Sequence, residues 1–220
     1  MDHVDKSVRL LKEAVEEFDR GAFATSSFQT QGVPLLHLIS EHAPYLTIWF
    51  IDTGFHFAET LHYRDKLQDF LGLNIRLLPR TNAERIEETR AELWATDSDA
   101  CCKALKVDVL EGLLSMYEHT CWISGVRRMQ TAARSQMGER EAAPHGITRV
   151  HPMIGWSRLM IEEYMEEHGL PRHPLADKGY ESIGCWPCTV PGQNRRGRWP
   201  GQQKEGCGIH GLIERTLCEE

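Results

Sequence analysis

The chain has 220 residues, enough for one substantial domain with its own hydrophobic core. Its 25 Lys and Arg residues against 32 Asp and Glu residues give a formal charge of −7, which argues against a nucleic-acid-binding surface because such domains are usually basic. No apolar run is long enough to span a membrane, and the first residues lack the apolar stretch of a secretory signal. We therefore expect a cytoplasmic protein that binds neither nucleic acid nor a membrane.

Helix and strand patterns alternate along most of the chain. In chain order, they predict a helix over 4–18, a strand at 22–24, a helix over 33–41, a buried strand at 45–51, a helix over 58–70 and a strand at 75–78. The second half predicts a helix opened by a capping box at 81–84, a helix over 99–117, strands at 121–125 and 148–152, and a helix over 157–168. This alternation is typical of an α/β fold with a mostly parallel sheet covered by helices on both faces.

Three polar turns follow strands of this expected sheet, at residues 25–30, 52–54 and 125–128. Ligands bind beyond the carboxyl ends of parallel strands, so we expect these turns to face one crevice. From about Asp177 the sequence loses its periodicity. We therefore divide the chain into an α/β nucleotide-binding domain over 1–190 and a mobile C-terminal tail over 191–220.

Four of the seven cysteines form two short motifs, Cys101-Cys102 and the Cys-x-x-Cys of Cys185 and Cys188. Four thiolates can hold a structural zinc or an iron–sulfur cluster. Adjacent cysteines on a helix point about 100° apart, which suits two corners of a cube better than one small ion. The alternative is two buried cysteines beside an incidental Cys-x-x-Cys. Lys106, one turn beyond Cys102, either offsets the charge of such a cluster or is an ordinary solvated lysine.

A further cysteine, Cys207, lies between two glycines near the C-terminus, close to Lys204 and His210. Neighbouring cations favour the thiolate, which is the reactive form of cysteine. Upstream, Arg195 and Arg198 supply forked donors suited to phosphate or sulfate oxygens. These residues indicate attack of a thiol on an anionic group, although a free surface cysteine beside a solvated arginine loop would give the same pattern.

Several motifs together resemble the adenylyl-sulfate / phosphoadenylyl-sulfate reductase family, in its cluster-binding form. They lie, in chain order, at 26–28, 51–54 with 59–60, 101–102 with 106–107, 122–128, 151–152 with 156, 179–189, 197–199 and 207–210. One departure is Gly206, which stands where the family usually has a glutamate directly before the cysteine; here Glu205 comes one place earlier.

The resemblance implies a fold like that of the adenine nucleotide alpha hydrolase (ATP-pyrophosphatase) group, with a turn at Ser26 and Ser27 that cradles the nucleotide phosphate. It implies a 4Fe–4S cluster on Cys101, Cys102, Cys185 and Cys188. It also implies that the phosphosulfate is contacted by Lys106, Arg127, Arg195 and Arg198, and that Cys207 is the nucleophile. From its place after a buried strand, Asp52 either binds the ribose or caps a turn.

The reaction implied is the thiol-dependent reduction of adenylyl sulfate to sulfite and AMP in sulfate assimilation, through an S-sulfonate on Cys207. The implied reductant is thioredoxin or a similar dithiol donor. Phosphoadenylyl sulfate is the alternative substrate. Two other interpretations are a zinc-stapled nucleotide-binding module and an ATP-dependent adenylating enzyme. The sequence leaves the oligomeric state open, a homo-oligomer included.

Overall fold

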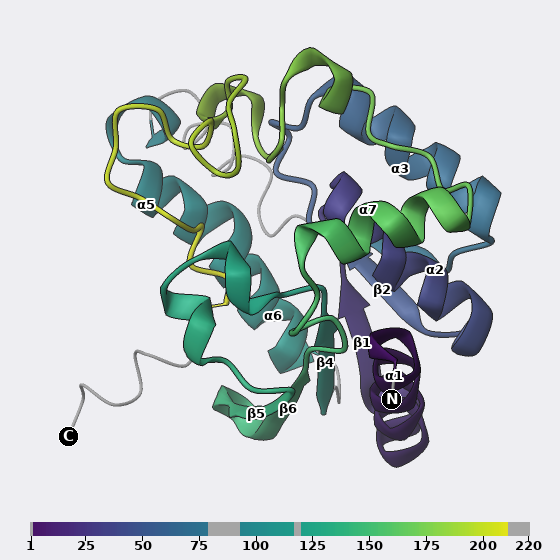
Figure 1. Ribbon diagram of the computed structural model, residues 1–220. Coiled ribbons are helices and arrows are strands. Elements are labelled where there is room, and N and C mark those ends of the chain that lie inside the picture. Colours follow the sequence, from purple (N-terminus) through teal and green to yellow (C-terminus); the bar gives the residue numbers. More distant parts are fainter. Residues whose placement is uncertain (1, 79–92, 117–119, 211–220) are drawn as a thin grey trace.

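A six-stranded sheet lies at the centre of the computed structural model, which describes residues 2–78, 93–116 and 120–210 (Figure 1). The strands are β1 (Ala22–Thr25), β2 (Thr47–Phe50), β3 (Ile75–Leu77), β4 (Cys121–Ser124), β5 (Arg140–Ala143) and β6 (Ile147–Val150). Their order across the sheet is β3-β2-β1-β4-β6-β5, and all neighbouring pairs are parallel except β5 with β6. The prediction of a mostly parallel sheet is confirmed.

The helices are α1 (His3–Phe18), α2 (Val33–His42), α3 (Ala58–Leu71), α5 (Ser98–Cys102), α6 (Asp108–Met116) and α7 (Arg158–Glu167). Periodicity locates α1, α2, α3 and α7 to within one residue at each end. The single helix expected over 99–117 is instead interrupted, because the π-helical turn η3 (Lys103–Val107) separates α5 from α6. The capping box expected at 81–84 lies outside the described residues.

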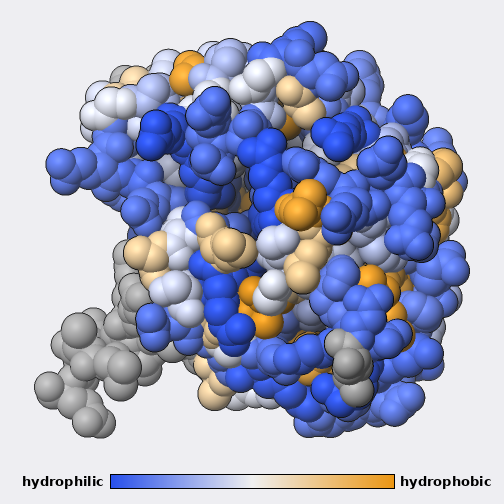
Figure 2. Space-filling view, in the orientation of Figure 1, coloured by the Kyte–Doolittle hydropathy of each residue, from blue (hydrophilic) through white to orange (hydrophobic). Residues whose placement is uncertain are grey.

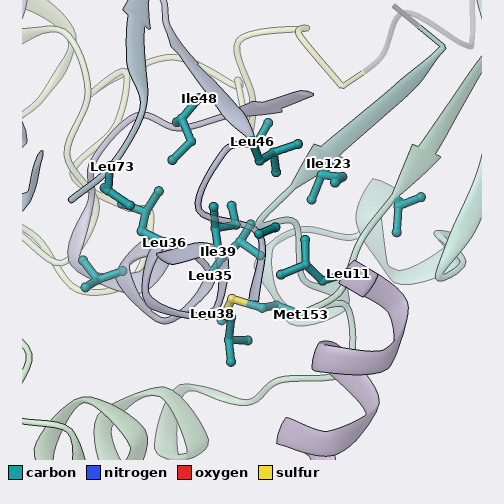
Figure 3. Packing of buried hydrophobic residues seen from close by; sticks show 14 of the residues in the cluster. Leu11, Leu35, Leu36, Leu38, Ile39, Leu46, Ile48, Leu73, Ile123 and Met153 are labelled. Carbon is teal, nitrogen blue, oxygen red and sulfur yellow. The ribbon is translucent and has the colours of Figure 1, made fainter. Parts of the chain in front are cut away.

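Apolar side chains alternate between the two faces of the sheet. Ala22, Ala24 and Ile48 point into a core formed with α1, α2, α3 and α7, which Figure 3 shows around the leucines of α2. Phe23 and Trp122 point to the other face, where they meet the buried leucines of α6. Burying each large apolar side chain contributes about 1.5–3 kcal/mol, so the two faces together hold the helices on the sheet.

The edge strand β5 is not predicted by the sequence. Its residues, Arg-Glu-Ala-Ala, include none of the β-branched or aromatic types that mark strands. It is held instead by antiparallel pairing with β6, which places Glu141 opposite Arg149. The Arg149 guanidinium donates to the Glu141 carboxylate at 3.3 Å across this pair.

The C-terminal segment lies against the body of the protein as far as residue 210. In Figure 1 this yellow segment runs alongside α5 and towards α6. Trp199 is buried, and its backbone N–H donates to the carbonyl of Cys188 at 2.9 Å. The domain boundary at 190 and the mobility of the tail both remain predictions. No helix within the described part of the chain is long and apolar enough to cross a membrane.

Candidate functional site

A cavity of about 400 Å³ opens beyond the carboxyl ends of β1 and β4. Segments far apart in the sequence line it: the turn at Ser26 and Ser27, the stretch after β4, the π-helical turn and the C-terminal segment. Eight of the predicted site residues are among its lining residues: Ser26, Ser27, Lys106, Arg127, Cys185, Arg195, Arg198 and Cys207. Strongly hydrophilic residues gather around a hollow in the middle of the face shown in Figure 2. The turns after β1 and β4 therefore share one crevice, as expected, whereas the third turn, at 52–54, contributes no lining residue.

Phe28 shapes the serine turn at the end of β1. Its backbone has a positive φ of 51°, which is unfavourable for a bulky residue. The ring is fully buried and meets Phe50 edge-on, with 5.6 Å between the ring centres. The hydroxyl of Ser26 accepts from the N–H of Phe28 at 3.1 Å, which closes the turn. Apolar burial thus fixes a turn whose serine side chains line the cavity.

Arginines crowd the cavity wall. Arg127 and Arg198 are only 4% and 8% exposed, and the Nε atom of each is buried without a hydrogen-bond partner among the described residues. Burial, followed by repulsion from Arg134, lowers the pKa of Arg127 to about 10. Burial and the nearby Arg198 lower the pKa of Arg195 to about 10 as well. Because unpaired buried cations are costly, this wall is suited to a multiply charged anion.

Gly184 is the residue that lets Arg198 reach the cavity. A Cβ atom at position 184 would lie 2.2 Å from a terminal nitrogen of the Arg198 guanidinium, closer than real contacts allow. The same guanidinium donates to the carbonyl of Ile183 at 3.3 Å. The glycine before the Cys-x-x-Cys motif thus makes room for an arginine that comes later in the chain.

Cys207 lies in the cavity wall, half-buried. Burial alone would raise the pKa of its thiol, but the ammonium of Lys106, the backbone N–H of Ile209 and two arginines outweigh burial, so the pKa lies below its usual value. Conversely, burial would lower the pKa of Lys106, but the sulfurs of Cys185, Cys207 and Cys102 raise it. Lys106 Nζ lies 3.9 Å from the Cys102 sulfur, on the helix face that the spacing predicts. The thiolate of Cys207 is therefore stabilised by a charged lysine.

The other four motif cysteines come from α5 and from the Cys-x-x-Cys turn, which contains η8 (Trp186–Cys188). Cys101 packs with Cys185, and Cys102 packs with Cys188 beside Trp199. Burial raises the pKa of the Cys101 thiol to about 11, and the sulfurs of the other three cysteines add to this effect. Four buried thiolates would thus repel one another unless a cationic group lay between them. Within the described ranges, no three His, Cys, Asp or Glu side chains are arranged so that they could hold a metal ion.

Lys204 and Arg134 are two cations that the sequence analysis did not assign. The Lys204 ammonium donates to the carbonyl of Ser98 at 2.7 Å and pairs with Asp99 at 2.7 Å, which fastens the C-terminal segment to the start of α5. Arg134 lines the cavity, where burial lowers its pKa and the Cys207 sulfur raises it. The sequence places Lys204 near Cys207 but does not show its contact with α5, and Arg134 lies outside every motif.

Asp52 does not line the cavity. Its carboxylate accepts from the backbone N–H of Gly54 at 2.8 Å. This contact caps the turn, which is one of the two roles that the sequence analysis left open for Asp52. Its contact with ribose remains a prediction.

Comparison with known proteins identifies the family to which the chain belongs. Residues 21–191 match the phosphoadenosine phosphosulfate reductase domain family. The adenosine 5'-phosphosulfate reductase of Mesorhizobium japonicum is 39% identical over 90% of this chain and 80% of its own length. The enzyme of the same name from Rhodococcus opacus is 37% identical over 87% of this chain and 79% of its own length.

Solved structures share the fold. The phosphoadenylyl-sulfate reductase of Candida auris, in its phosphate complex, superposes with a TM-score of 0.73 at 24% identity, over 84% of this chain and 90% of that one. The FMN adenylyltransferase of Candida glabrata gives a TM-score of 0.65 at 14% identity, over 87% of this chain and 65% of that one. The expected adenine nucleotide alpha hydrolase-like fold is confirmed. By its matching domain and its relatives, this chain belongs to the phosphoadenosine phosphosulfate reductase family.

Proposed function

We propose that this chain reduces adenylyl sulfate to sulfite and AMP at the thiol of Cys207, in sulfate assimilation. The observation that carries the proposal is the position of this thiol, whose pKa is lowered, on the wall of a cavity crowded with buried cations. The curated relatives at 37% and 39% identity carry the name adenosine 5'-phosphosulfate reductase, which supports adenylyl sulfate as the substrate.

In the first step, the Cys207 thiolate attacks the sulfur atom of the phosphosulfate. A sulfur–sulfur bond forms, the bond from sulfur to the bridging oxygen breaks, and AMP leaves with the electron pair. Arg127, Arg195 and Arg198 neutralise the charge on the phosphosulfate and on the departing oxygens. Lys106 keeps Cys207 in its thiolate form, and the hydroxyls of the turn after β1 hold the nucleotide phosphate.

In the second step, a thiolate of an external dithiol such as thioredoxin attacks the Cys207 sulfur. Sulfite leaves, and a mixed disulfide forms between the donor and Cys207. The second thiol of the donor then displaces the Cys207 thiolate and becomes oxidised to a disulfide. The two electrons that reduce the sulfur therefore come from the donor, and Cys207 returns to its starting state.

A 4Fe–4S cluster on Cys101, Cys102, Cys185 and Cys188 is the second part of the proposal. A donor set of four thiols, with adjacent cysteines on one short helix, fits the separate corners of a cube better than one zinc ion, which needs its ligands to converge on a point. When bound, the cluster supplies charge compensation for the four thiolates and joins α5 to the Cys-x-x-Cys turn.

The alternative substrate is phosphoadenylyl sulfate, the compound for which the matching domain family is named. It would react by the same two steps and release adenosine 3',5'-bisphosphate. The cavity contains cations beyond those assigned to the phosphosulfate, Arg134 and Arg158 among them, which is the observation that keeps this substrate under consideration.

The test is an anaerobic assay of sulfite release with each nucleotide, alongside iron and zinc analysis. We expect faster turnover of adenylyl sulfate and about four irons per chain, as the cube requires. Preference for the 3'-phosphorylated nucleotide would reverse the substrate assignment, and zinc without iron would overturn the cluster. Cys207→Ser is expected to bind AMP but release no sulfite, while Cys218→Ser, at the other cysteine near the C-terminus, keeps wild-type turnover.

A further inference from the structure

Arg149 is a buried arginine that neither reaction step uses. It lies on β6, and its side chain is only 1% exposed. The strand register places it between Trp122 on β4 and Glu141 on β5. A charged side chain inside a sheet is costly unless its hydrogen bonds are made, so its partners indicate what it does.

The partners of Arg149 lead to the C-terminal segment. Its Nη1 donates to the backbone carbonyl of His210 at 2.9 Å, and its Nη2 donates to Glu141 at 3.3 Å. The guanidinium lies 5.5 Å from the centre of the Trp122 ring. That ring stacks on the His210 imidazole, with centres 5.1 Å apart and planes 9° from parallel. Trp122, Arg149 and Glu141, here called the anchor row, thus hold both the backbone and the ring of His210.

The anchor row acts at one end of the short stretch that carries Cys207. At the other end, Lys204 is fastened to Ser98 and Asp99 at the start of α5. Between the two attachments, Ile209 packs against the buried apolar residues on this face of the sheet. Because each residue extends the chain by at most about 3.6 Å, a cysteine three residues from one attachment and three from the other has little freedom to leave the cavity wall.

We propose that Arg149 is a positioning residue for the reaction, holding the His210 carbonyl so that the Cys207 thiol stays within reach of the bound phosphosulfate. The rate measurement below rests on the function proposed above. Without this contact, the segment leaves the cavity in a larger fraction of molecules, and attack by Cys207 slows in proportion. Nucleotide binding changes little, because the serine turn and Arg127 belong to the body of the protein.

The test is the substitution Arg149→Met, which keeps a long side chain and removes the hydrogen bonds to His210 and Glu141. At saturating adenylyl sulfate, we expect Cys207 S-sulfonate to form about tenfold more slowly, the loss expected for one hydrogen bond from a charged group. The dissociation constant for AMP should be unchanged. Without substrate, iodoacetamide should alkylate Cys207 faster, because the segment leaves the wall more often. Arg149→Lys should recover part of both effects.

Arg140→Met is the matched control. Arg140 lies on β5 near the same sheet edge, but its guanidinium pairs with Glu17 and lies over the ring of Phe18, both on α1 and away from the C-terminal segment. In Arg140→Met, the rate of S-sulfonate formation and the rate of Cys207 alkylation should equal those of the wild type.

Unchanged S-sulfonate formation and unchanged alkylation in Arg149→Met would overturn the proposal, and so would a parallel loss of AMP binding. If that variant does not fold, Glu141→Gln replaces it, because it keeps the side-chain size while removing the charge that orients the guanidinium. S-sulfonate formation and alkylation of Cys207 are then measured in Glu141→Gln instead, with the same expected results. If the wild-type chain forms no S-sulfonate, the proposed function fails, while alkylation without substrate still tests the anchor row.

Discussion

Lys106 lines the cavity together with Cys185 and Cys207, and its Nζ lies 3.9 Å from the sulfur of Cys102. All three sulfurs favour its charged form despite burial. One ammonium group therefore stabilises the Cys207 thiolate, and it would offset the negative charge of the proposed cluster on the other cysteines. The sequence predicts its position through the spacing from Cys102, but its effect on Cys207 depends on a chain segment a hundred residues later.

At this scale, Lys106→Met is expected to slow the formation of the Cys207 S-sulfonate by roughly a hundredfold, the size of effect seen when one charge-stabilising donor is removed from an active site. AMP binding should be largely kept, because AMP lacks the sulfate that lies nearest the thiol. Single-turnover measurements with adenylyl sulfate check this.

Lys103→Met provides the comparison for Lys106. Lys103 lies one turn earlier, is exposed and pairs with Asp108 outside the cavity. Equal losses in the two variants would mean that Lys106 acts only through the fold of the helix.

Among the elements, α3 is joined to the chain after α7 by a buried histidine. His173 Nε2 lies 3.0 Å from the hydroxyl of Thr60 on α3, and its Nδ1 accepts from the N–H of Leu175 at 3.1 Å. Its backbone N–H donates to the Thr30 hydroxyl at 3.1 Å. Acceptance at Nδ1 requires the neutral imidazole, so protonation would break this connection.

Burial lowers the pKa of His173 from 6.5 to about 4. The unfolded chain therefore binds a proton at a higher pH than the folded chain does. We expect the contribution of His173 to the free energy of unfolding to be constant above pH 6.5 and to fall as the pH is lowered from 6.5 towards 4. Denaturant titrations of His173→Asn should show a shallower fall over this range.

His145→Asn is the control for this measurement, because His145 is exposed and its positive φ of 64° suits asparagine. Its pH dependence should match that of the wild type. A wild-type slope in His173→Asn would show that this histidine is not the group that titrates.

Sequence patterns predict some of the helices and strands of this fold and miss others. Helical periodicity locates α1, α2, α3 and α7, because each buries one apolar stripe on the sheet. The break between α5 and α6 has no such signal, since η3 keeps an apolar pattern while it changes the backbone. The strand β5 pairs with β6 and contacts Arg149 across that pair. The charge of Arg149, within the strand predicted at 148–152, is the only sequence clue to this contact.

At the scale of the whole molecule, the site is assembled from segments that are far apart in the sequence. No local sequence pattern shows that these segments meet. The sequence motifs predicted eight of the residues that line the cavity, because the residue types within each motif already indicate its chemistry. They could not predict that Arg134 joins the same wall, that Lys204 is fastened to α5, or that His210 is held by β6. The contacts of Lys204 and His210 arise only when the C-terminal segment folds back against α5 and the sheet.

One turnover of the wild-type protein with adenylyl sulfate, in the absence of any thiol donor, followed by peptide mass mapping, identifies the residue that receives the sulfuryl group. We expect a single sulfonate on the peptide that contains Cys207, released as sulfite when a dithiol is added. A sulfonate on any other side chain, or sulfite release while Cys207 remains a free thiol, would contradict the mechanism.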